Sequence, residues 1–187
     1  MIPYCYLNSK QYYYLLIFLS VAICLLDVMR TLNPRFRYLC HNVFDDVLRE
    51  SEKKQAFSGI SYMILGFLFS YIISGHSSLY ITSCLILIFA DPLSGLVGSV
   101  LRTKGWRMLC FFIAACIISF NINGYEFYFY KNQIFGQYSN ITGLLIASGI
   151  TTLAEGYNRT LRVNDNFSIP VVYSITIKIW NYLLLQF

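Results

Sequence analysis

The sequence predicts an all-α integral membrane protein, a polytopic helical bundle with about six transmembrane helices in a single membrane domain over residues 1–187. Of these 187 residues, 57% are apolar and 12% are charged. A soluble domain has about 25% charged residues, because it needs a polar surface that this composition does not supply. The composition therefore excludes most soluble enzymes, nucleic-acid-binding modules and disordered chains.

Charged residues divide the chain into apolar runs that suit a bilayer, since a helical span needs about 20 apolar residues. We predict spans near residues 12–29, 55–75, 79–101, 108–125, 138–154 and 167–186. The first run follows Lys10, and no small-x-small cleavage site comes after it, so we interpret it as a retained first span or a signal anchor. The second, fourth and fifth spans lie in stretches of 21, 18 and 23 residues without a charge. The third contains one charge, Asp91, and the last contains one, Lys178.

The basic residues predict the orientation of these spans. Loops 30–54, 102–107 and 155–166 together contain 11 of the 14 Lys and Arg residues, and the opposite side has Lys10 and Lys131. By the positive-inside rule the three basic loops are cytoplasmic and both termini face the other side. The net charge of +5 then follows from topology and does not require a nucleic-acid partner.

Asp91 is the sharpest candidate for function, because an ionisable group inside a span is costly. It precedes Pro92, and 11 residues of helix, about 16 Å, separate it from Arg102. Small residues recur after it at helical spacing and predict one small, polar stripe on the same face: Ser94, Gly95, Gly98 and Ser99. Such a stripe also suits simple helix packing.

Two further carboxylates end or begin a predicted span. Gly143, Ala147, Thr151 and Glu155 follow one another at steps of four, so a small-residue face leads to Glu155. Asp165 opens the last span, where a helix cap is an equally good interpretation. A similar small-residue face in the second span comprises Gly59, Tyr62, Met63, Gly66 and Ser70.

These carboxylates and the neighbouring basic loops suit metal-assisted phosphoryl chemistry. Mg²⁺ prefers one or two carboxylates together with substrate phosphates, and Lys and Arg neutralise phosphate charge in the transition state. A basic cytoplasmic loop is also what topology alone produces.

Three ordered motifs resemble the CTP-dependent lipid kinases, the group of dolichol kinase, CTP-using diacylglycerol kinase and phytol kinase, which is related to the phosphatidate cytidylyltransferases. Residues 49–66 (RESEKKQAFSGISYMILG) resemble its R-x-x-E-[KR]-x-x-x-[TS]-G-x-[ST]-Y-x-x-x-G element. Residues 89–98 (FADPLSGLVG) resemble its second element, and 154–156 (AEG) with 165–170 (DNFSIP) resemble its closing one. The resemblance covers about two-thirds of the chain, from Arg49 to Val172.

The resemblance implies a CTP-dependent transfer of phosphate to the hydroxyl of a membrane lipid alcohol, with Mg²⁺ as cofactor. Asp91, Glu155 and Asp165 would be the catalytic and metal-binding residues, supported by Asn166. Lys53, Lys104 and Arg102 would contact the phosphates of CTP. The lipid would enter sideways between spans lined by the small-residue faces.

One stretch departs from the family pattern. The family carries G-K-[ST]-x-E-G-[ST], whereas residues 103–112 read TKGWRMLCFF, so Arg107 stands in the place of a glutamate. Two alternatives to an active lipid kinase therefore stay open. One is a phosphatidate cytidylyltransferase-like enzyme that makes CDP-lipid. The other is a catalytically impaired member, or a transport protein, that keeps the fold.

Overall fold

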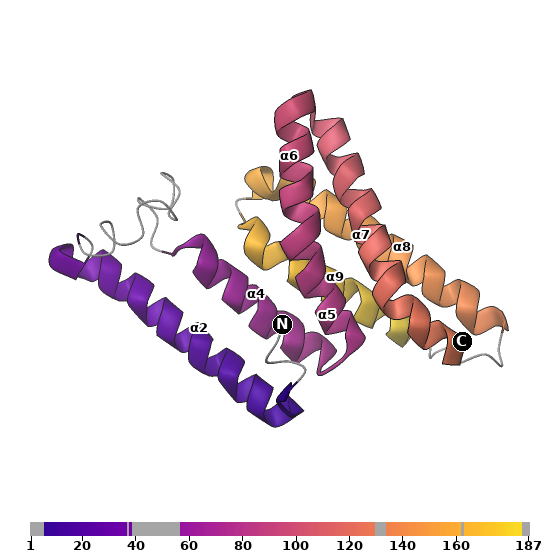
Figure 1. Cartoon of the computed structure of the whole chain (residues 1–187), viewed down its shortest axis with the longest axis horizontal. Coiled ribbons are helices and arrows are strands. Elements are labelled where there is room, and N and C mark those ends of the chain that lie inside the picture. The colour runs from indigo at the N-terminus through magenta and orange to yellow at the C-terminus, as the bar shows by residue number, and fades with distance from the viewer. Residues whose placement is uncertain (1–5, 37, 39–56, 130–133, 162, 185–187) are drawn as a thin grey trace.

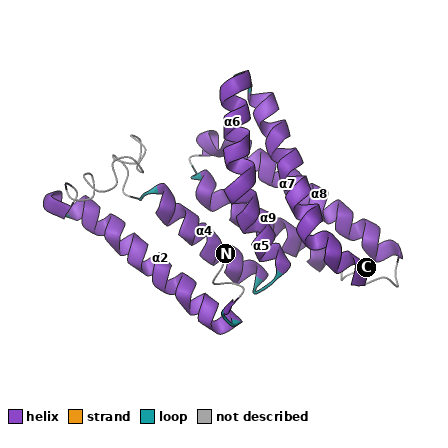
Figure 2. Ribbon diagram, in the orientation of Figure 1, coloured by secondary structure: helices purple, strands orange, loops and turns teal. Residues whose placement is uncertain are grey.

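The computed structural model describes residues 6–36, 38, 57–129, 134–161 and 163–184, and these form an assembly of helices (Figure 1). No strand occurs among the described residues, as the colouring of Figure 2 makes plain. The predicted all-α class is therefore confirmed.

Helices α2 and α4 form one edge of the described part of the molecule, where they lie alongside each other (Figure 1). Helix α2 (Ser9–Leu32) begins with a capping box in which the Asn8 side chain accepts from the amide of Gln11, and the Gln11 side chain accepts from that of Asn8. Helix α4 (Gly59–Ser74) begins at Ser58 and ends at Gly75, whose φ of 70° favours glycine. Tyr12, Leu16, Tyr71, Tyr80 and Cys84 form the buried core between α2, α4 and the following helix.

The third predicted span is one helical run with a change of pitch in its middle. Helix α5 (Ser78–Leu85) continues into a π-helical turn, η2 (Ile86–Ala90), and then into α6 (Asp91–Leu101). Pro92 has no N–H, and its ring crowds the carbonyl four residues earlier, which lies within η2. The wider π-helical turn follows from this conflict, and the run is continuous where Pro92 could have broken it.

The last three helices are α7 (Lys104–Phe129), α8 (Ile134–Leu161) and α9 (Asp165–Leu184). They enclose the larger core with η2, and α9 also packs along α4. Phe111, Ala147, Ile169 and Tyr173 have no exposed surface in this core. In Figure 1 the α6–α7 pair projects from this central part of the molecule.

Within the described part of the chain, three helical stretches are long and apolar enough to cross a membrane: Ser9–Leu32, Ser78–Leu101 and Lys104–Asn123. Helix α4 is apolar but has 16 residues, so it is shorter than these three. Large apolar side chains stay exposed along such helices, for example Phe18 at 69%, Leu96 at 66% and Val100 at 77%. Exposed apolar surface on this scale fits a lipid bilayer environment, while the count of six spans stays a prediction.

The small-residue faces of α4 and α8 pack against α9. A Cβ on Gly66 would lie 2.7 Å from the backbone oxygen of Asn166, and one on Gly143 would lie 2.3 Å from the Trp180 ring. The Ser70 hydroxyl also contacts those of Ser83 and Ser174, each at 2.6 Å. The expectation that these two faces form a lipid entrance is therefore wrong, because a neighbouring helix already fills them.

Candidate functional site

One cavity of about 1160 Å³ brings together most of the residues that the sequence singles out. Residues of α6, the start of α7, the end of α8 and the first residue of α9 line it. Five of the seven predicted site residues line it: Asp91, Arg102, Lys104, Glu155 and Asp165. The three carboxylates and two of the three predicted phosphate-binding cations therefore share one space.

Helix α6 forms a long wall of this cavity. Asp91, Gly95, Gly98 and Ser99 line it, as their helical spacing predicts, and Pro92 and Leu96 add apolar surface. Ser94 is instead fully buried, and its hydroxyl donates to the Asp91 carbonyl at 2.8 Å. The stripe is therefore open to a ligand at Gly95 and Ser99, while Gly98 packs against Arg107 of α7.

Glu155 is the most deeply buried of the three carboxylates, because its side chain has no exposed surface. It forms an ion pair with Arg107, in which Arg107 Nη2 donates to Glu155 Oε1. The Arg107 side chain is 33% exposed and also lines the cavity. Arg107, which departs from the kinase-like motif, therefore pairs with Glu155, the carboxylate that the kinase-like motifs assign to the site.

The polar groups around this ion pair are only partly satisfied. Glu155 Oε2, Arg107 Nε and Asn158 Nδ2 are buried and have no hydrogen-bond partner among the described residues. Asn158 also lines the cavity, and its Oδ1 accepts from the Ser168 hydroxyl at 3.0 Å. Buried polar groups normally have partners, so three such atoms at one cavity indicate a place for a ligand.

Arg102 and Lys104 stand at the α6–α7 turn. Arg102 ends α6 in the left-handed region with φ of 53°, and its amide donates to the Gly98 carbonyl at 3.0 Å. This turn lets α7 start two residues later, at Lys104. The Lys104 ammonium lies 4.1 Å from the centre of the Tyr157 ring, a cation–π contact that joins α7 to α8.

The start of α9 supplies Asp165 and Asn166. Asp165 lines the cavity, and its Oδ1 also accepts from the Asn166 amide at 2.9 Å. The Asn166 side chain donates to the Gly59 carbonyl at 3.2 Å and so ties α9 to the start of α4. Lys53 lies outside the described residues.

The predicted Mg²⁺ site at Asp91, Glu155 and Asp165 stays a prediction. Among the described residues, no group of three His, Cys, Asp or Glu side chains is arranged to hold a metal ion. Glu155 already has a cationic partner in Arg107. The donor set fits an Mg²⁺ ion that arrives with phosphate oxygens and needs one or two carboxylates, but not one held by three carboxylates alone.

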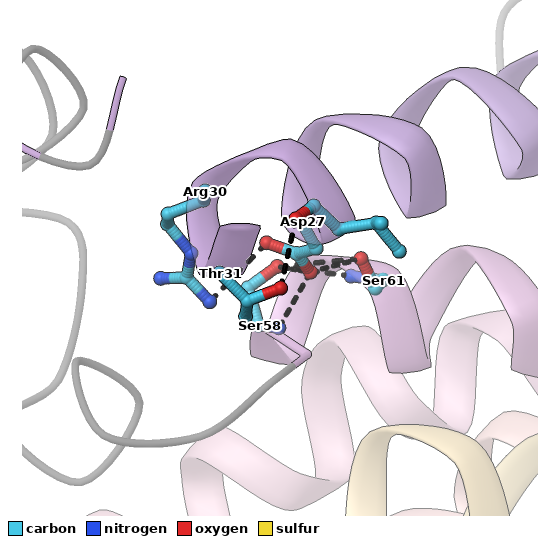
Figure 3. A network of polar contacts seen from close by, with 6 residues as sticks. Asp27, Arg30, Thr31, Ser58 and Ser61 are labelled. Carbon is cyan, nitrogen blue, oxygen red and sulfur yellow. Dashed lines mark hydrogen bonds and ion pairs between the residues drawn. The ribbon is translucent and has the colours of Figure 1, made fainter. Parts of the chain in front are cut away.

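A second buried carboxylate, Asp27 of α2, lies against the start of α4 (Figure 3). Its Oδ2 accepts from the Ser58 amide at 2.6 Å, the Ser58 hydroxyl at 2.9 Å and the Ser61 hydroxyl at 2.5 Å. Its Oδ1 pairs with Arg30 at 3.3 Å. We call Asp27, Arg30, Ser58 and Ser61 the α2–α4 clamp. Ser58 and Ser61 belong to the first kinase-like motif, so part of that motif joins two helices.

Sequence reasoning missed four residues of these clusters: Asp27, Arg107 as the partner of Glu155, Asn158 and Ser168. The spacing of Asp27 and Arg30, three residues apart in an apolar helix, was a signal for a buried pair. Arg107 was visible as a departure from the motif, but its partner lies 48 residues away. Ser168 lies in the closing kinase-like element, at residues 165–170, but nothing in the sequence pairs it with Asn158.

Comparison with known proteins places the chain beside one bacterial relative. No family model matches the chain, and no solved structure matches it. RP860 of Rickettsia prowazekii (strain Madrid E), an uncharacterized protein, is 35% identical over 179 residues. The match covers 91% of this chain and 83% of that protein. The chain therefore belongs to the same family as RP860.

Proposed function

We propose that the protein transfers the γ-phosphoryl group of a nucleoside triphosphate to the hydroxyl of a membrane lipid alcohol. CTP is the donor that the kinase-like motifs imply, and diacylglycerol, a polyprenol such as dolichol, or phytol is the class of acceptor. The observation that carries the proposal is the shared cavity of Asp91, Glu155 and Asp165 with Arg102, Lys104 and Arg107. Carboxylates and cations in one cavity are what phosphoryl transfer at a membrane surface requires.

The two ends of the α6 wall suit different parts of the reaction. Arg102 and Lys104 at the turn supply positive charge for the phosphates of the nucleotide. Asp91 lies at the opposite end of α6, beside the apolar surface of Pro92 and Leu96. In our proposal the lipid chain approaches along this apolar surface, and Asp91 orients its hydroxyl for in-line attack.

Mg²⁺ would bind with the phosphates of the nucleotide, through one or two of the cavity carboxylates, and would neutralise charge on the transferred group. Arg102, Lys104 and Arg107, from one of the predicted basic segments, line the cavity, so by the positive-inside rule the cavity would be on the cytoplasmic side. That side is where a nucleoside triphosphate is available.

The test is a donor and acceptor screen with the full chain in lipid nanodiscs. CTP labelled at the γ-phosphate, Mg²⁺ and a panel of diacylglycerol, dolichol and phytol should yield one labelled phospholipid. Asp91→Asn should lower the rate at least about 100-fold, because it removes the carboxylate that orients the hydroxyl. Asn121→Ala is the control, since the Asn121 side chain is exposed and bonds to Ile117 of its own helix.

Two outcomes would contradict the proposal. Release of pyrophosphate with formation of a CDP-lipid would identify a cytidylyltransferase. Absence of any labelled lipid, together with wild-type behaviour of a cell carrying Asp91→Asn, would identify a non-catalytic family member.

A further inference from the structure

Arg107 and Glu155 form a buried charge pair that links α7 to α8 inside the cavity wall. Glu155 has no exposed side-chain surface, whereas a third of the Arg107 side chain is exposed. A buried carboxylate is strongly destabilised without a compensating charge or hydrogen bonds. Arg107 supplies the compensating charge for Glu155 in the absence of a ligand.

Each residue of the pair has one buried polar atom without a hydrogen-bond partner among the described residues. Glu155 Oε2 can accept, and Arg107 Nε can donate, yet neither has a partner among the described residues. Asn158 Nδ2 is a third unpartnered donor of the same cavity. One spare acceptor and two spare donors suit a ligand that brings a cation and an anion together.

Gly98 of α6 determines how the Arg107 side chain reaches Glu155. A Cβ at Gly98 would lie 3.1 Å from Arg107 Cδ and 3.4 Å from its Cβ and Cγ. The aliphatic stem of Arg107 thus passes over the bare backbone of Gly98. A Cβ at Gly95, one turn earlier, would meet no atom within 4 Å.

We propose that Arg107 is an exchangeable counter-ion. In the empty site it neutralises Glu155. When a phosphate-bearing ligand binds, the guanidinium turns to the phosphate, and Glu155 takes a divalent cation that accompanies that phosphate. This inference rests on the proposed phosphate-binding role of the cavity and deepens it. It gives Arg107 the task of preventing a divalent cation from binding Glu155 before the phosphate arrives.

The exchange predicts that cation and anion binding are coupled, since linkage between two ligands is reciprocal. Mn²⁺ serves as the probe, because its binding to the full chain in nanodiscs is measured by electron paramagnetic resonance. Wild-type protein should bind Mn²⁺ weakly. Arg107→Gln should bind Mn²⁺ at least tenfold more tightly, since Glu155 then lacks its counter-ion. Arg107→Lys keeps the charge and should bind Mn²⁺ as weakly as wild type.

The double variant Arg107→Gln/Glu155→Gln is the control for the site of binding. It is neutral at both positions, and it should lose the gain in Mn²⁺ affinity. Equal Mn²⁺ affinity in wild type and Arg107→Gln would overturn the exchange, as would a gain that persists without Glu155.

If Arg107→Gln fails to fold, Gly98→Ala provides a second test. The added methyl group would displace the Arg107 stem by a few tenths of an ångström and weaken its pairing with Glu155. Mn²⁺ affinity should then rise a few-fold. Gly105→Ala should leave it unchanged, because Gly105 does not line this cavity and an added Cβ there would meet no atom within 4 Å. An equal response of the two alanine variants would contradict the inference.

Failure of this inference is distinguishable from failure of the proposed function. Formation of phosphorylated lipid without an Arg107-dependent change in Mn²⁺ affinity would contradict the counter-ion exchange but not the proposed lipid kinase activity. An Arg107-dependent gain in Mn²⁺ affinity with no phosphorylated lipid would remove the lipid kinase and leave the counter-ion role in place.

Discussion

The α2–α4 clamp and the cavity each contain a buried carboxylate paired with an arginine, but the two carboxylates differ in how fully they are satisfied. Asp27 Oδ2 accepts three hydrogen bonds, and its Oδ1 pairs with Arg30. Glu155 Oε1 pairs with Arg107, and its Oε2 has no partner among the described residues. A fully satisfied polar cluster stabilises one structure, whereas a partly satisfied one has capacity for a ligand.

This difference separates the framework of the protein from its site. The Asp27 pair lies within one helix, three residues apart, and closes onto the capped start of α4. The Glu155 pair joins two helices at a cavity. We therefore expect substitutions in the clamp to change stability more than ligand binding, and substitutions at the cavity pair to do the reverse.

The largest expected effect on stability comes from Asp27→Ala. It leaves Arg30, which is 5% exposed, and the donors of Ser58 and Ser61 without their carboxylate. Removing one partner of a buried ion pair costs about 3–5 kcal/mol, which corresponds to a fall in melting temperature of about 10 °C for a protein of this size. Thermal unfolding in detergent measures it.

Glu155→Ala is the matched comparison. Arg107 keeps access to water through the cavity, so the loss of stability should stay below about 2 kcal/mol. An equal fall in melting temperature for the two variants would show that Glu155 belongs to the framework as much as Asp27 does.

A smaller change in stability should follow when a methyl group is added to a glycine of the framework and, for comparison, to a glycine of the cavity. Gly66→Ala places a Cβ 2.7 Å from the Asn166 carbonyl oxygen, on the framework side. Because the clash is with backbone, α4 and α9 must move apart, at a cost of about 1–3 kcal/mol.

Gly95→Ala is its counterpart at the cavity, where a Cβ meets nothing within 4 Å. It should leave the melting temperature unchanged or raise it slightly, since alanine favours a helix by about 1 kcal/mol over glycine. A similar loss in both variants would contradict the tight packing at Gly66.

The smallest effect concerns the backbone of Arg102, which has φ of 53°. Arg102→Gly and Arg102→Ala remove the same charge, but only glycine adopts this conformation without a steric cost. The glycine variant should be more stable than the alanine variant by about 1 kcal/mol.

Both variants of Arg102 should lose nucleotide phosphate binding to the same extent, as measured by fluorescence titration with a labelled CTP. A difference in binding between them would show that the turn, and not the charge, matters.

The sequence was a good guide to the position of the helices and to five cavity residues. Runs between charges fix where helices lie, and motif order brings Asp91, Glu155 and Asp165 together. The pairing of Arg107 with Glu155 depends on the relative register of α7 and α8, which no local pattern encodes. The sequence also could not show that the small-residue faces of α4 and α8 pack against α9, because glycine at helical spacing suits a neighbouring helix as well as a ligand. Within the α6 stripe, Gly95 and Ser99 stay exposed, whereas Arg107 of α7 covers Gly98 and Ser94 is buried.

The length of α4 has a consequence for the surrounding lipid. At its start the helix meets Asp27, and at its end the Lys178 ammonium donates to the Ile73 carbonyl at 2.8 Å, so an anion and a cation complement the helix dipole. Its 16 residues rise about 24 Å, which is about 6 Å less than the hydrocarbon thickness of a typical bilayer. If α4 crosses the membrane, this hydrophobic mismatch thins the bilayer beside it. A lipid headgroup next to the protein would then sit deeper than its neighbours.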